Sequence, residues 1–465
     1  MLRAAKFLQT GWQPRHTSVR CYAYPKKVFE MMKNAPPTCY TQLDNGLRVA
    51  TERRDVAHAC IGFFIDGGSR YESRFENGIA HFFEHIVFRG TRCRARSILE
   101  HQMSNTGARF HTFTTRELCG YYAECLCEDA PIIIDLLADC IFHNSLSRPE
   151  IEREKEIVFR EIMQADEDAN AVLFDYLHGA AYHGTTLAQS VMGQSSNLYN
   201  FCDTTIGRYL SKTFDPTRTV LAAVGGVKHE KIVELANHFV SGLQPSKCMY
   251  EDYRYTASDF RFRNDDLPFC NTAIAFEGPG LCDEDNYTMD VAAMYLGGWD
   301  RSQPGGPEHP NKIARAGLIE NMCDAYRTFN FKYKDGGLWG IQFLGHPLYL
   351  DELLYNIQSE FMNLCCMVTV NEVRRAKRAL KTRLMTKLEN ATCACIDLGR
   401  YTLYMGRRPE LYERICEIDK VLPEDVHLVC SHYIYDRCPC VAAVGPSESL
   451  PEYNRIRAGQ YWMRL

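Results

Sequence analysis

The segment His81-Phe82-Phe83-Glu84-His85 gathers side chains that can hold a metal ion and move protons. Apolar residues precede and follow it, which favours a buried helix rather than a loop. On a helix, positions i, i+3 and i+4 lie on one face, so both imidazoles and the carboxylate point the same way. Two imidazoles spaced in this way can bind one Zn²⁺ ion, at about 2.0–2.1 Å from each nitrogen. The segment therefore predicts part of a zinc site.

Glu84 is the predicted general base of this site, because it lies one turn from His81 and is not needed as a ligand. A bound zinc ion lowers the pKa of its water to about 7, so a carboxylate can take a proton from that water at neutral pH. The order H-x-x-E-H reverses the more common H-E-x-x-H and marks the inverzincins. Such a short motif also arises by chance, and the histidines would then be core residues beside a buried ion pair.

A catalytic zinc ion needs a third protein ligand. Residues 150–178 are predicted to form one long helix, because their apolar residues recur at three-to-four spacing. Glu154 and Glu161 are two turns apart on this helix and share a face. Spacing alone does not choose between them and the other carboxylates of the helix. These competitors are Glu150, Glu152, Glu156 and Glu167.

The motif resembles that of the pitrilysin-type, or inverzincin, metallopeptidases. Phe88-Arg89-Gly90-Thr91 and Arg160-Glu161-Ile162 extend the resemblance, which covers about residues 41–465. It implies that Glu161 is the third zinc ligand, with His81 and His85. It also implies that Glu154 supports the site from behind and joins Glu84 among the catalytic residues. One zinc ion per chain is expected, since residues 289–295 of the second half contain no His and no Glu.

Three later segments narrow the resemblance to the mitochondrial branch of this family. They are Asp175-Tyr176-Leu177-His178, Leu187-Ala188-Gln189-Ser190 and Tyr453-Asn454-Arg455-Ile456-Arg457. The branch contains β-type processing peptidases, which cut basic presequences from imported proteins, and core 1 subunits of the cytochrome bc1 complex. The resemblance thus implies a zinc endopeptidase that forms a heterodimer with an α-type homologue. The alternative is a scaffold subunit with bc1 subunits as partners and weak or no peptidase activity.

One strand departs from the pattern of the active β subunits. Where they have Leu-Asn-Ala-Tyr-Thr along the substrate, this chain has Phe110-His111-Thr112-Phe113-Thr114. The missing amide and phenol are groups that could position substrate, and misplacement of substrate is costly in rate. His111 either replaces part of this function or is an ordinary surface histidine. A stretch rich in acid favours the peptidase, since residues 117–170 hold fourteen acidic and four basic residues and could attract a basic peptide. The alternative is an ordinary acidic helix surface.

The amino-terminal residues have the composition of a mitochondrial targeting segment. Residues 1–29 contain no Asp or Glu and carry six basic residues among Ser, Thr and apolar residues. Residues 1–22 are the predicted transit peptide, with Arg20-Cys21-Tyr22-Ala23 resembling a cleavage site. A basic terminus without order is the alternative. The predicted compartment is the mitochondrial matrix, or the matrix face of the inner membrane for a bc1 subunit.

The chain of 465 residues shows signs of an internal duplication. Residues 219–226 resemble residues 439–446, residues 60–66 resemble 271–277, and residues 112–122 resemble 331–343. These matches predict two similar α+β domains, at residues 40–245 and 258–465, with the metal site in the first only. Runs of strands followed by helices in each half favour α+β over a doubly wound parallel sheet.

Composition excludes several other classes of protein. The net charge of −5 offers no basic field for nucleic acid. No run approaches 18 apolar residues, so no membrane span is expected. The 21 cysteines could suggest a secreted disulfide protein, but the count is odd, the chain is long and no secretory signal opens it. We expect most of them to be small buried apolar residues in a reducing compartment.

Overall fold

The computed structural model describes residues 35–243, 252–303 and 308–461. The predicted transit peptide, residues 1–22, lies outside the described residues. The predicted domain boundary falls partly outside them as well, because residues 244–251 separate the two halves of the chain. Helix α8 (His229–Val240) precedes that gap, and strand β7 (Asp259–Arg263) follows it.

Two six-stranded mixed sheets form the framework of the molecule. The first has the strand order β1-β2-β6-β3-β5-β4, and the second has the order β7-β12-β8-β11-β10-β9. The strands of the first sheet are β1 (Thr38–Gln42), β2 (Arg48–Arg53), β3 (His58–Asp66), β4 (Arg109–Thr114), β5 (Leu118–Leu126) and β6 (Thr219–Gly225). The other strands of the second are β8 (Cys270–Gly278), β9 (Gly298–Asp300), β10 (Cys323–Lys332), β11 (Gly337–Gly345) and β12 (Cys440–Gly445).

The predicted duplication is confirmed by the order of these strands. Strand β6 takes the same place as β12, β3 the same place as β8, and β4 and β5 the places of β10 and β11. In both sheets one pair is parallel, β2 with β6 and β7 with β12, while the remaining pairs are antiparallel. The segments 112–122 and 331–343 each run from one strand through a turn into its antiparallel neighbour, β4 into β5 and β10 into β11. The fold is therefore two similar α+β halves, as the sequence predicts.

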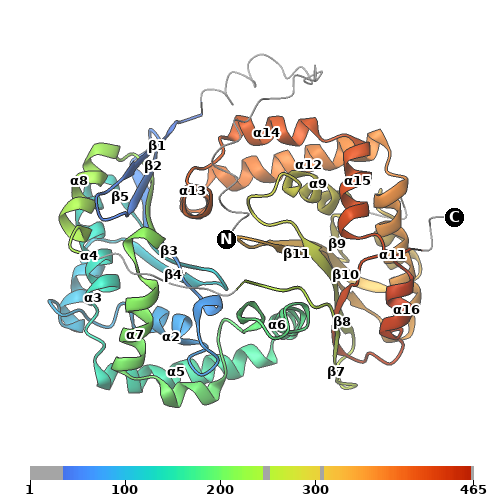
Figure 1. Cartoon of the computed structure of the whole chain (residues 1–465), viewed down its shortest axis with the longest axis horizontal. Coiled ribbons are helices and arrows are strands. Elements are labelled where there is room, and N and C mark those ends of the chain that lie inside the picture. The colour runs from blue at the N-terminus through green and yellow to red at the C-terminus, as the bar shows by residue number, and fades with distance from the viewer. Residues whose placement is uncertain (1–34, 244–251, 304–307, 462–465) are drawn as a thin grey trace.

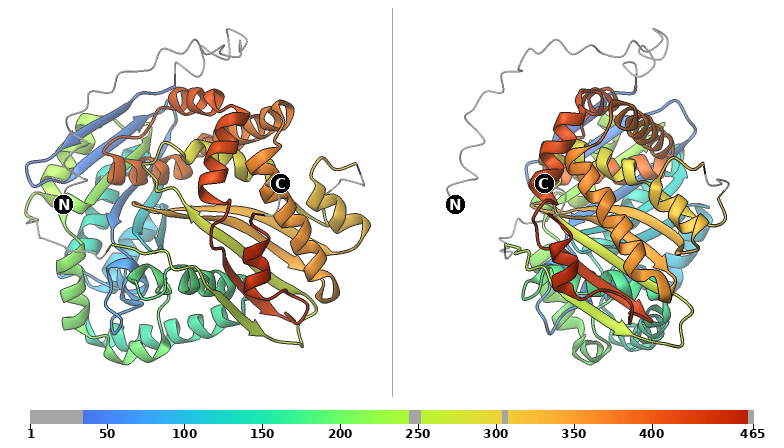
Figure 2. Two further views of the ribbon diagram at one scale, coloured as in Figure 1. Left: turned by 45° about the vertical axis from the view of Figure 1, so that its right-hand side comes forward. Right: turned by 90° about the vertical axis from the view of Figure 1, so that its right-hand side faces the viewer.

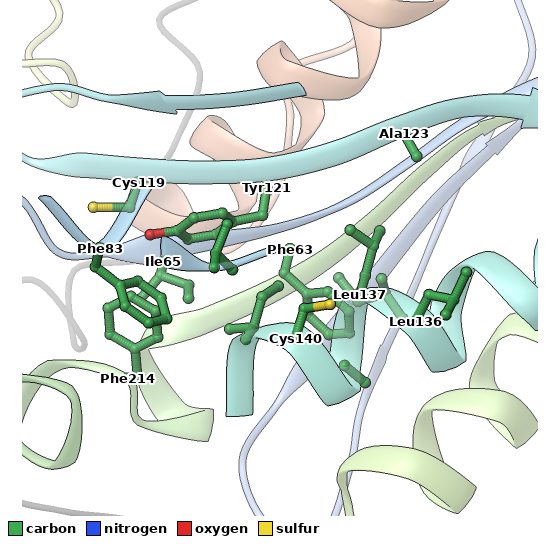
Figure 3. Close-up of a cluster of buried hydrophobic side chains, with 14 of the residues drawn as sticks. Phe63, Ile65, Phe83, Cys119, Tyr121, Ala123, Leu136, Leu137, Cys140 and Phe214 are labelled. Atoms are coloured by element: carbon green, nitrogen blue, oxygen red, sulfur yellow. The ribbon is translucent and has the colours of Figure 1, made fainter. Parts of the chain in front are cut away.

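Helices of the first half cover the outer face of the first sheet, which is the face turned away from the second half. Figure 3 shows Phe63 of β3 next to Leu137 and Cys140 of α4, and Tyr121 of β5 next to Phe83 of α2. All five side chains are fully buried. Burying each of these large side chains stabilises the fold by about 1.5–3 kcal/mol. The helices of this half are α2 (Ile79–Ile86), α3 (Arg96–Asn105), α4 (Ala130–Phe142), α5 (Arg148–Glu167), α6 (Ala169–Ala181), α7 (Asp203–Thr213) and α8.

Helices of the second half cover the outer face of the second sheet in the same way. Trp339, Ile341 and Phe343 alternate along β11 and point into this second core, where each is at most 1% exposed. The helices are α9 (Asn286–Leu296), α10 (Lys312–Ile319), α11 (Leu350–Cys366), α12 (Val370–Glu389), α13 (Ala391–Met405), α14 (Leu411–Lys420), α15 (Pro423–Tyr433) and α16 (Tyr453–Ala458).

Each half also lends one helix to the inner face of the other half's sheet. Helix α6 of the first half packs on β8 and β12, and helix α13 of the second half packs on β3 and β6. Figure 1 and the left view of Figure 2 show the two halves side by side, with α6 and α13 between the sheets. The exchange buries the inner faces of both sheets, so the two halves hold one another in place.

The single helix predicted over residues 150–178 is wrong in one respect, because the structure divides it into α5 and α6. Asp168 lies between them with an extended backbone, at φ −81° and ψ 103°. Its side chain accepts a hydrogen bond from the Asn170 backbone N–H at 2.9 Å and so caps α6. The apolar spacing continues across this break, which explains why the periodicity alone does not reveal it.

Two expectations from composition can be compared with the described residues. No helix among them is long and apolar enough to span a bilayer. None of the cysteines in the described residues forms a disulfide, and about half of them are buried. Those buried side chains pack among apolar residues on the outer and inner faces of the two sheets.

Candidate metal centre

Helix α2 brings the two histidines together. Its apolar face, formed by Ile79, Phe82, Phe83 and Ile86, is at most 1% exposed and packs into the first core. The opposite face carries His81, Glu84 and His85, as the i, i+3, i+4 spacing predicts. The imidazole rings of His81 and His85 lie with their centroids 5.0 Å apart and their planes at 82°.

Helix α5 packs against α2 and brings Glu161 to both histidines. Glu161 Oε2 lies 2.8 Å from His85 Nε2 and 3.4 Å from His81 Nε2. One ligand atom from each of these three residues lies within 4.8 Å of the other two. In the described part of the chain, no other group of three or more His, Cys, Asp or Glu side chains comes together in this way.

The donor set and its surroundings fit a metal ion. His81 Nε2 is buried and has no hydrogen-bond partner in the structure, although buried ring nitrogens are usually paired. It lies 3.4 Å from Glu161 Oε2, the carboxylate oxygen that is also next to His85. Two imidazole nitrogens and one carboxylate oxygen are the ligand types of catalytic zinc sites, which keep a further position open. His81, His85 and Glu161 could therefore hold a zinc ion.

The charges of the site in the metal-free protein follow from these contacts. Burial alone would lower the pKa of His81, but the carboxylates of Glu161 and Glu84 raise it to about 9. Burial and the neighbouring His81 lower the pKa of His85. Contact with His81 lowers the pKa of Glu161. A protonated His81 is thus stabilised by the carboxylates of Glu161 and Glu84.

Glu84 lies beside this group and not within it. Its Oε2 is 3.7 Å from His81 Nδ1, and its Oε1 accepts a hydrogen bond of 3.0 Å from the Thr112 hydroxyl on β4. Burial acts to raise the pKa of Glu84, but His81 and the hydroxyls of Thr112 and Thr114 bring it below its ordinary value. The carboxylate is therefore ionised at neutral pH, which is the form that a general base needs.

Glu154 lies behind the histidines and is almost fully buried. Its Oε2 is 3.9 Å from His85 Nδ1, and its Oε1 is 2.8 Å from Arg89 Nε. The side chain is 2% exposed, whereas Arg89 is 30% exposed. This placement suits a carboxylate that orients the imidazole of His85 and is held in turn by Arg89.

The structure separates the remaining carboxylates of α5 from the metal group. Glu150 pairs with Arg96 and Arg153, at 2.7 and 2.8 Å. The others, Glu152, Glu156 and Glu167, are exposed. The packing of α5 on α2 thus places Glu161, and none of these three or Glu150, next to the two histidines.

Sequence reasoning missed two residues that contact the site. The Thr112 hydroxyl donates a hydrogen bond to Glu84. His111, the candidate named from the sequence of this strand, is exposed and stacks on Tyr122 with ring centroids 5.2 Å apart. Alternation along β4 could have shown that residues 111 and 112 face opposite sides. Glu72 was also missed, and it binds the first turn of α2 through backbone N–H groups. A lone glutamate several residues before a helix carries no local signal of that role.

Comparison with known proteins gives the family of this chain. A family model described as insulinase (peptidase family M16) matches residues 48–195, and a second, described as the peptidase M16 inactive domain, matches residues 206–380. The chain belongs to peptidase family M16. The three candidate ligands of this M16 chain lie within the first matched range. The second match covers much of the half in which the described residues form no such group.

The curated relatives of this M16 chain carry two different names. It is 39% identical over 446 residues to cytochrome b-c1 complex subunit 1, mitochondrial, of Mus musculus, covering 94% of this chain and 92% of that protein. It is also 39% identical over 438 residues to mitochondrial-processing peptidase subunit beta of Bos taurus, covering 93% and 89%. Among solved structures, a chain of complex III2 from Candida albicans, Inz-5 bound, matches with a TM-score of 0.82 and 23% identity. That match covers 91% of this chain and 99% of the other, and it shows the shared fold.

Proposed function

We propose that this chain is a zinc endopeptidase of the processing peptidase β type, which removes basic presequences from imported precursor proteins. The observation that carries the proposal is the convergence of His81, His85 and Glu161, with Glu84 ionised beside them. A zinc ion in this place would act as a Lewis acid and make water a usable nucleophile at neutral pH.

Each residue of the site has a part in this proposal. His81, His85 and Glu161 would hold the zinc ion, and three protein ligands of this kind are typical of catalytic sites in which water can also bind. Glu84 accepts the proton of the attacking water and then delivers it to the departing amine. Glu154 fixes the orientation of His85 and is fixed by Arg89.

The position of β4 at the edge of the first sheet favours a peptide as the substrate. This strand is the last strand of the first sheet among the described residues, and its Thr112 contacts Glu84. An extended peptide can add to such an edge through main-chain hydrogen bonds and would then pass close to the catalytic carboxylate. In the second sheet, the corresponding strand β10 is not at the edge, because the short strand β9 pairs with part of it. This difference fits a substrate site in the first half only.

Local charge supports a basic peptide in particular. Asp166, Glu167 and Asp168 are exposed together at the end of α5, the helix that supplies Glu161. Other acidic residues of the stretch 117–170 are engaged in ion pairs, such as Glu117 with Arg70 and Asp139 with Arg94. The field that a substrate meets therefore comes from the end of α5 more than from the whole stretch.

The proposal includes a location and a partner. The curated relatives with both names are described as mitochondrial, which supports the matrix as the compartment. We propose that the chain forms a heterodimer with a homologous α-type subunit and that the presequence binds between the two.

A second candidate function is that of a core 1 subunit of the bc1 complex. It is supported by a relative of that name at the same identity as the peptidase relative, and by the fold match to a complex III2 chain. In this case bc1 subunits are the partners, the chain lies on the matrix side of the inner membrane, and peptidase activity is weak or absent.

Replacement of the general base separates these candidates. Glu84→Gln keeps the shape of the side chain, so it should retain zinc and fold but lose presequence cleavage by about two to four orders of magnitude. Cleavage of a synthetic basic presequence is measured with the chain reconstituted with an α-type subunit, and zinc is measured by elemental analysis. Glu156→Gln, an exposed position on α5, is the matched control and should cleave like the wild type. If wild type and Glu84→Gln are equally inactive and both assemble into a bc1 complex, the core subunit is the correct function.

A further inference from the structure

The first turn of α2 cannot be capped by its own residues. Gly78 is the N-cap residue and has a left-handed backbone, with φ 97° and ψ −1°. A Cβ atom at this position would lie 2.5 Å from the Met192 backbone oxygen. Both the backbone angle and the close contact require glycine, so the Ser, Thr, Asp or Asn that usually caps a helix cannot stand here.

The carboxylate of Glu72 provides what the local sequence lacks. Its Oε2 accepts hydrogen bonds from the Gly78 N–H and the Asn77 Nδ2, and its Oε1 accepts one from the Ala80 N–H, each at 2.8 Å. Glu72 is 2% exposed, so these contacts are made away from water. A buried carboxylate is expensive unless it is paired in this way, and here all three partners are donors.

The position of this carboxylate relative to the metal group gives it a second effect. His81 follows Ala80 directly and lies in the first turn of α2. The start of a helix carries a partial positive charge of about +0.5, which repels a cation bound there. A negative charge on the same N–H groups offsets that repulsion at the place where His81 would hold a divalent ion.

We propose that Glu72 is a positioning residue of the metal centre, which caps α2 in place of an N-cap side chain and offsets the helix dipole beneath His81. The proposal rests on the zinc site proposed above. It predicts that zinc affinity depends on the charge at position 72, although this residue does not touch the metal.

Three variants test this with zinc affinity as the readout, measured by competition with a chromophoric chelator. Burial raises the pKa of Glu72 to about 7, so measurements at about pH 8 keep it ionised. Glu72→Gln should bind zinc about 2- to 30-fold more weakly than the wild type, the range expected for a charge at a helix end. Glu72→Asp keeps the charge but reaches less far, so its affinity should lie between the two. Glu76→Gln is the control, since Glu76 is close in sequence but its side-chain carboxylate accepts from the Ser73 hydroxyl and pairs with Arg208, not with the first turn of α2.

Amide hydrogen exchange gives a second readout that needs no metal. The Gly78 and Ala80 amides should exchange faster in metal-free Glu72→Gln than in the wild type, while thermal unfolding shows that the protein is folded. Unchanged zinc affinity in Glu72→Gln, or equal losses in Gln and Asp, would overturn the proposal. If Glu72→Gln does not fold, Glu72→Asp decides, and wild-type affinity with wild-type exchange in that variant would refute it. If the wild type binds no zinc, the metal site itself is refuted. Unchanged amide exchange at Gly78 and Ala80 in Glu72→Gln would then separately refute the capping role.

Discussion

Glu154→Gln is the substitution that most directly tests whether a residue behind the ligands controls the metal. The wild-type carboxylate contacts His85 Nδ1 at 3.9 Å on one oxygen and Arg89 Nε at 2.8 Å on the other. Glutamine has the same shape but no charge. It no longer attracts Arg89 or the N–H of His85 as a carboxylate does.

The size of the effect follows from this geometry. Loss of a partner that orients a ligand typically costs about 10- to 100-fold in metal affinity, or about 1.4–2.7 kcal/mol. The effect on folding should be smaller, about 1–2 kcal/mol in the metal-free protein, because Gln keeps the shape of the buried side chain and Arg89 is 30% exposed and can reach water. Zinc affinity should therefore fall more than stability.

The assay compares zinc competition and urea unfolding for the wild type, Glu154→Gln and Glu156→Gln. Glu156 is on the same helix with its side chain 77% exposed, so its variant should match the wild type in both measurements. Wild-type zinc affinity in Glu154→Gln would refute the reasoning. So would a loss of stability large enough to account for the whole change in affinity.

Three further predictions concern other parts of the molecule. Glu161→Gln removes a ligand charge and should weaken zinc binding more than Glu154→Gln does; equal affinity by competition assay would argue against ligation by Glu161. Phe83→Ala should lower the free energy of unfolding by about 3–5 kcal/mol, because the ring is fully buried against Tyr121 and Phe214; a change below about 1 kcal/mol in urea unfolding would contradict this packing. Complete burial lowers the pKa of His178, so its stabilising contribution is present above about pH 6.5 and is lost as the pH falls, by about 1.4 kcal/mol per unit until the folded-state pKa is reached. His178→Gln should remove that part of the pH dependence of unfolding, and an unchanged slope would disprove it.

The sequence by itself determined the features that depend on local spacing. His81, Glu84 and His85 share a face because any helix places positions i, i+3 and i+4 together, whatever surrounds it. The sequence revealed the duplication because equivalent strands have similar buried residues and recur at similar distances along the chain. Strands β6 and β12 are one such pair. These features need no knowledge of which element packs on which.

Only the tertiary structure decided which distant groups meet. Several carboxylates of α5 have suitable spacing, but the packing of α5 on α2 brings Glu161 to the histidines, Glu154 behind them and Glu150 to two arginines. Thr112 and Glu72 reach the site from a neighbouring strand and from the chain before α2. The break at Asp168 depends on a side-chain cap, which the apolar period does not record. Contacts between segments far apart in the chain depend on how whole elements pack, and local spacing contains no information about that packing.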